Sequence, residues 1–160
     1  MNNKEWYMDY ATHAFSEYAK LGCPTRAEQE ERIRRGIYKR FAEKNPEQIL
    51  RLAERELANH DGLLRDIDAV NKTFDMLLNK IPLDTVDTEK ACRNGADIAN
   101  AISYVYFGLH RDKPSNRRIC GRVRLYAQTL PASERTVYRW LRYGRRLFAK
   151  NRGLTFDDEF

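Results

Sequence analysis

The apolar positions of this chain recur mostly every three or four residues, which is the period of amphipathic helices. The first such run ends at the helix-breaking sequence Gly22-Cys23-Pro24, and its apolar positions are Trp6, Tyr10, Phe15 and Tyr18. No segment shows the two-residue alternation of a half-buried strand. The pattern therefore predicts an all-α fold.

Capping residues predict where the next helices begin. Thr25 has the character of an N-cap, with Glu28 three residues later, and this helix is expected to run to about Lys44. Asn45 can cap a third helix that opens with Pro46, and Asp61-Gly62 predicts a break or kink after it. The fourth helix is the most regular, with an apolar stripe formed by Leu63, Leu64, Ile67, Val70, Phe74, Leu77 and Leu78.

The pattern is interrupted near residues 80–86, where Pro82 lies in a connector. We therefore expect a helical N-terminal part over 1–82, which holds a core and could also oligomerise. A three-helix unit over 83–153 and an acidic tail over 154–160 would follow. In that unit a helix opened by Thr85 or Asp87 would run to Gly108.

Basic residues are concentrated in the C-terminal third. The segment from Arg111 to Gly153 contains 13 Lys and Arg residues and two acidic residues, a net charge of +11, although the whole chain carries only +6. The rest of the chain is therefore at −5. Basic residues can simply solvate exposed helix faces, but this asymmetry favours an anionic partner. Most of these residues are arginines, which suit phosphate and guanine edges.

The last helix separates its apolar and basic residues onto different faces. Ser133 can cap it. We expect an inward face of Val137, Trp140, Leu141, Gly144 and Phe148. Its remaining faces carry Glu134, Arg135, Tyr138, Arg139, Arg142, Arg145 and Arg146. The pattern fits a DNA-recognition helix, and also a purely structural helix with a solvated basic face.

Three segments together, 101–108, 119–127 and 133–147, resemble the region-4 helix-turn-helix of sigma factors. They resemble more closely the small sigma-like regulators of phages and mobile elements. The matching positions of the motif S-x-x-T-V-x-R-x-L are Ser133, Thr136, Val137, Arg139 and Leu141. The resemblance covers roughly 98–152. The connection over 128–132 departs from the family, because it is longer than the usual tight turn and contains Pro131.

The resemblance implies that the last helix docks in the major groove of DNA. The base-reading positions that it implies are Glu134, Arg135, Tyr138 and Arg139. Contacts with the DNA backbone are expected from Arg117, Arg118, Arg122, Ser133, Arg142, Arg145, Arg146 and Lys150.

Other chemistry finds little support in the sequence. The three histidines and three cysteines have no metal-ligand spacing, and no phosphate-binding loop or acid–base pair stands out. We expect neither a metal, a cofactor nor a catalytic residue, so the chain is not expected to be an enzyme. No stretch has the length of a membrane span, no secretory signal is visible, and reduced cysteines favour the cytoplasm.

The sequence thus predicts a sequence-specific transcriptional regulator of a phage or mobile element, with double-stranded DNA as its partner. RNA polymerase and a second copy of the chain are further candidate partners. One alternative is a DNA-packaging or recombination accessory, similar to a terminase small subunit or an excision factor. The other alternative is a helical adaptor that binds a polymerase or a sigma factor.

Overall fold

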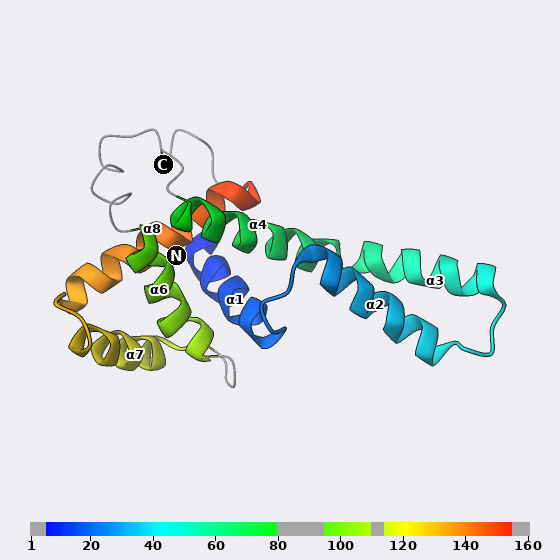
Figure 1. Cartoon of the computed structure of the whole chain (residues 1–160), viewed down its shortest axis with the longest axis horizontal. Coiled ribbons are helices and arrows are strands. Elements are labelled where there is room, and N and C mark those ends of the chain that lie inside the picture. The colour runs from blue at the N-terminus through cyan, green and yellow to red at the C-terminus, as the bar shows by residue number, and fades with distance from the viewer. Residues whose placement is uncertain (1–5, 80–94, 110–113, 155–160) are drawn as a thin grey trace.

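The computed structural model describes residues 6–79, 95–109 and 114–154, in which all regular structure is helical (Figure 1). An all-α fold is therefore confirmed for these ranges. The helices are α1 (Trp6–Lys20), α2 (Arg26–Arg40), α3 (Pro46–Asn59), α4 (Asp61–Leu78), α6 (Gly95–Val105), α7 (Asn116–Gln128) and α8 (Glu134–Arg152), with a 3-10 turn at Phe107–Leu109. The predicted start of the fifth helix and the predicted boundary near 80–86 lie outside the described residues.

Side-chain caps begin three of these helices as the sequence predicts. The Thr25 hydroxyl accepts a hydrogen bond from the Glu28 backbone N–H at 3.2 Å. The Asn45 side chain caps α3, and Ser133 accepts from the Thr136 N–H at 3.2 Å at the start of α8. Helix α2 ends at Arg40, short of the predicted Lys44, because residues 41–44 form the turn that reverses the chain into α3.

A single core joins α1, α4, α6, α7 and α8 into one body. Its largest fully buried side chains come from both sides of residues 80–86 and include Phe15, Ile67, Ile98, Tyr106 and Phe148. Aromatic rings meet at the centre, where the Phe15 centroid lies 5.4 Å from that of Phe148 and 5.8 Å from that of Tyr106. The N-terminal helices and the basic C-terminal helix therefore stabilise each other directly.

The α8 helix lies at the centre of this body. Val137, Leu141, Gly144 and Phe148 are buried, as predicted. Trp140, predicted on the same face, packs against the edge of the core and stays half-buried. Toward the C-terminal end Leu147, Phe148 and Ala149 are all buried, because α1, α4 and α6 surround this part of the helix.

Polar anchors also hold the end of α8 in place. The Asp66 carboxylate of α4 accepts from the Arg152 guanidinium at 2.7 Å and from the Tyr10 hydroxyl at 2.8 Å. Burial raises the pKa of Tyr10, and the neighbouring Asp66 adds to that rise. The Asn151 amide donates to the Thr73 hydroxyl at 3.0 Å. These contacts join α1, α4 and α8 where the last helix ends.

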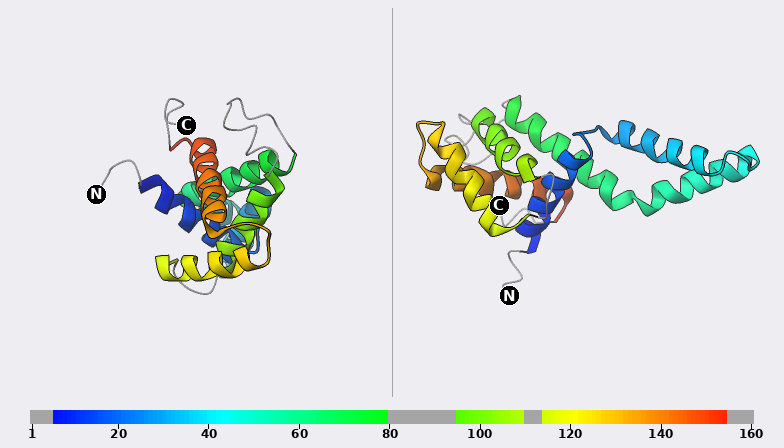
Figure 2. Two further views of the ribbon diagram at one scale, coloured as in Figure 1. Left: turned by 90° about the vertical axis from the view of Figure 1, so that its left-hand side faces the viewer. Right: turned by 90° about the horizontal axis from the view of Figure 1, so that it is seen from below.

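Helices α2 and α3 form an antiparallel hairpin that projects from the body, and we call this hairpin the arm (Figure 2). Its own small core consists of Ile37, Ile49 and Ala53, with Phe41 and Leu52 packed against them. At its base the Arg26 guanidinium binds the Asp68 carboxylate of α4 at 2.6 Å. The arm is therefore attached to the body mainly through α4.

Two glycines permit close helix contacts in the body. A Cβ atom at Gly95 would collide with the Leu77 backbone carbonyl of α4, and one at Gly144 would meet the Ile102 side chain of α6. The second neighbour is the flexible end of a side chain. The first is backbone within a helix, so the α4–α6 contact requires glycine at 95.

We predict that Gly95→Ala lowers the free energy of unfolding by about 1–3 kcal/mol, because one helix must move away from the other. Chemical denaturation followed by circular dichroism measures the change. Gly36→Ala is the matched control, since its Cβ would meet nothing within 4 Å on α2. That control should be neutral or stabilise by up to about 1 kcal/mol. Equal effects of the two substitutions would contradict the close contact.

Candidate nucleic-acid interface

The surface predicted to bind DNA is built by α7, α8 and the turn between them. Ser115 caps α7, and Val123 and Tyr126 are buried on the α7 face that packs against α6 and α8. The Tyr126 ring stacks on Tyr104 of α6, with 4.8 Å between the centroids. Residues 129–133 then connect α7 to α8. Packing of their buried faces against the other helices of the body thus holds α7 and α8 in place.

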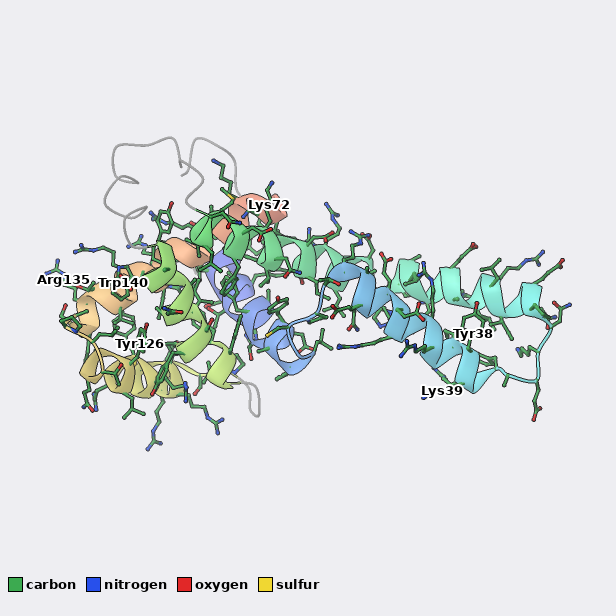
Figure 3. All side chains as sticks on the ribbon, viewed as in Figure 1. Tyr38, Lys39, Lys72, Tyr126, Arg135 and Trp140 are labelled. Atoms are coloured by element: carbon green, nitrogen blue, oxygen red, sulfur yellow. The ribbon has the colours of Figure 1, made fainter. Side chains whose placement is uncertain are left out.

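Four arginines line the face of α8 opposite its buried stripe. Their spacing of four, three and four residues places them on one side of a helix. They are Arg135, Arg139, Arg142 and Arg146, and we call them the arginine stripe. The first three are exposed and Arg146 is half-buried. Figure 3 shows Arg135 at the end of the body that lies farthest from the arm; the arm carries the labelled Tyr38 and Lys39.

The four predicted base-reading residues fall into two groups. Arg135 and Arg139 belong to the outward-facing stripe. Glu134 and Tyr138 lie toward α7, where the Glu134 carboxylate is 3.6 Å from the Arg124 guanidinium and the Tyr138 hydroxyl donates to the Cys120 sulfur at 3.1 Å. Both side chains remain exposed to solvent. These contacts link α7 to the start of α8.

The pKa of the Tyr138 hydroxyl is raised in this environment. Partial burial raises the pKa of Tyr138 to about 12, and the hydrogen bond to Cys120 contributes to the rise. The phenol therefore stays protonated in the folded protein at neutral pH. At neutral pH the hydroxyl can therefore donate a hydrogen bond to the Cys120 sulfur.

The predicted backbone-contacting residues also differ in their surroundings. Arg117, Arg118, Arg142 and Lys150 are exposed. The Arg122 guanidinium lies 4.5 Å from the Tyr104 ring centroid, and its Nε donates to the Tyr104 carbonyl at 2.7 Å, so it joins α7 to α6. The Ser133 hydroxyl is engaged in capping α8.

Arg145 and Arg146 are less accessible than the sequence suggests. Both are half-buried, and the Nε atom of each is buried without a hydrogen-bond partner in the described part of the chain. Burial raises the pKa of Tyr106, and the positive charge of Arg145 opposes that rise. Arg145 therefore lies toward the core side of α8, and Arg146 ends the arginine stripe.

Sequence reasoning missed one residue of this surface. Arg124 is exposed on α7 and reaches across to Glu134 of α8. It lies beside Leu125, whose side chain is also exposed. The only sequence signal for Arg124 is its place in the basic segment, because a contact between two helices depends on how they pack.

Within residues 6–79, 95–109 and 114–154, no group of three or more His, Cys, Asp or Glu side chains could hold a metal ion. In the same ranges no helix has both the length and the apolar character needed to cross a membrane. Comparisons with protein-family models, with curated proteins and with solved structures found no match.

We predict that Cys120→Ala lowers the pKa of Tyr138 from about 12 toward its ordinary value of 10.0, while burial keeps it above that value. The pH dependence of the Tyr138 ring signals in NMR spectra measures the change. Because the raised pKa favours the neutral phenol in the fold, its stabilising effect is complete below pH 10 and is lost as the pH rises toward 12. Cys23→Ala is the control, and an unchanged titration in Cys120→Ala would show that the hydroxyl–sulfur contact does not form.

Proposed function

We propose that the chain is a sequence-specific DNA-binding regulator that docks the N-terminal half of α8 in the major groove. The observation that carries the proposal is the arginine stripe, which displays Arg135, Arg139 and Arg142 on one face of a helix whose opposite face is anchored in the core. In this reading α6, α7 and α8 form a helix-turn-helix unit. The assignment to regulators of phages and mobile elements, with RNA polymerase as a candidate partner, rests on the resemblance of 98–152 to that family.

Geometry and charge support this arrangement. A B-DNA major groove admits one α-helix, and arginine can contact guanine through two hydrogen bonds or a phosphate through its charge. Arg135, the first residue of the stripe, lies at the end of the body farthest from the arm (Figure 3), and Arg139 and Arg142 are also exposed to solvent. Glu134 is the one carboxylate in the first turn of α8, and it faces Arg124.

We divide the proposed roles by the position and exposure of each side chain. Arg135 and Arg139 are the base-reading residues in our proposal, because they lie nearest to the projecting N-terminal end of α8 and point outward. Arg142 and Arg146 would follow the backbone, and exposed Arg117 and Arg118 of α7 would contact phosphates of the same duplex. Tyr138 and Glu134 would border the groove while they keep α7 and α8 together.

The first test is binding to a duplex of random sequence, followed by fluorescence anisotropy at increasing salt. We expect affinity to fall steeply with salt, because phosphate contacts release counterions, and each lost contact should reduce the slope of log K against log salt by about 0.9. Arg142→Ala should therefore lower this slope. Arg65→Ala, which removes an exposed arginine of α4, should leave it unchanged. No binding at low salt would overturn the proposal.

The second test addresses base reading. On a selected DNA site Arg139→Ala should cost about 1–3 kcal/mol of binding free energy and relax the preference at one base pair. Competition between the selected site and random duplex measures this specificity. An equal loss on all sequences would assign Arg139 to a phosphate.

A further inference from the structure

The arm has too small a core for a pair of helices that stands apart from the body. Helices in proteins gain most of their stability from packing an apolar face. In the arm, Ile37, Ile49 and Ala53 are the buried apolar residues of a hairpin that spans residues 26–59. Helix α2 has buried residues only at Gln29 and Ile37. The body therefore leaves part of the arm's apolar surface uncovered.

Large apolar side chains are exposed in its outer half. Tyr38 is 49% exposed on α2 and Leu50 is 53% exposed on α3. Phe41 is half-buried against the arm's core, and two basic groups lie near its ring, the Arg40 guanidinium at 5.6 Å and the Lys44 amine at 5.0 Å from the centroid. Aromatic side chains such as that of Tyr38 are enriched in protein–protein interfaces.

The charge of the arm changes sign along its length. The tip, residues 34–52, has six basic and two acidic residues and a net charge of +4. The root, residues 26–33 and 53–61, has three basic and six acidic residues and a net charge of −3. At the tip, Arg34, Lys39 and Arg51 are exposed and form no ion pair within the described part of the chain.

We propose that two copies of this chain associate through their arms, side by side and antiparallel. This arrangement places the positive tip of each arm against the negative root of the other, and two-fold symmetry repeats the same pairing. The exposed apolar side chains of the tip are then buried between two hairpins, as in a four-helix bundle. Apolar burial supplies affinity, and the charge pattern sets the antiparallel orientation.

A second copy fits the arm better than nucleic acid does. A nucleic-acid surface is basic along its whole contact, whereas half of the arm is acidic. The acidic root would repel a duplex that extended along the arm. The acidic root attracts the basic tip of another copy. In a two-fold dimer both arms therefore make the same favourable contact. The inference is independent of DNA binding by α8.

Charge reversal at both ends tests the proposal. The tip variant combines Arg34→Glu, Lys39→Glu and Arg51→Glu. The root variant combines Glu31→Lys and Glu54→Lys. Sedimentation equilibrium of the full chain should give twice the 18.9 kDa chain mass for the unaltered protein. Each variant alone should dissociate, with a dimer Kd raised at least about tenfold, because like charges then meet across the interface.

Mixing the two variants is the decisive measurement. Their charges are complementary again, so an equimolar mixture should form a heterodimer, and this recovery also shows that both variants fold. The matched control reverses Arg135, Arg139 and Arg142 on α8 and should leave the dimer intact.

Three results would overturn the proposal. The first is an unaltered protein that is monomeric at every concentration, and the second is variants that stay dimeric. The third is a mixture that stays monomeric. Loss of DNA affinity in the tip variant of a monomeric protein would instead identify the tip as a nucleic-acid contact.

Discussion

The C-terminal half of α8 packs against α1, α4 and α6, and these contacts join the N-terminal helices to the C-terminal ones. Phe148 meets Phe15 of α1, while Arg152 and Asn151 bind Asp66 and Thr73 of α4. Because this half cannot rotate without breaking the core, the direction of the whole helix is set. The N-terminal half continues the same helix. The packing of the C-terminal half in the core therefore determines which way the arginine stripe faces.

Helix α7 completes this arrangement from the side. The Arg122 guanidinium joins it to the Tyr104 carbonyl of α6, and Tyr138 and Glu134 join it to the start of α8. Some of the polar side chains in the basic region therefore join helices to one another, and Arg135, Arg139 and Arg142 remain exposed to solvent. One basic helix can carry both kinds of side chain because they lie on different faces of it.

The sequence predicted what depends on local chemistry. Helix starts at Thr25, Asn45 and Ser133 follow from side-chain capping, and the buried face of α8 follows from a period of 3.6 residues. The directions of Glu134 and Tyr138 toward α7 could not be predicted, because periodicity defines a face but not the neighbour that it meets. The projection of the arm was missed for the same reason, since helix periodicity does not show whether a helical hairpin packs against a body or extends from it.

The central place of α8 also affects how the protein folds during synthesis. Helices α1, α4 and α6 each bury apolar surface against a segment that the ribosome makes after them. Until residues 134–152 emerge, side chains such as Phe15 and Ile98 lack their partners on α8, and exposed apolar surface of this kind promotes aggregation. The most extensive contacts of the arm join α2 to α3, which are neighbours in the sequence, so this packing does not depend on α8. The nascent chain would therefore carry an open core that only its last helix closes.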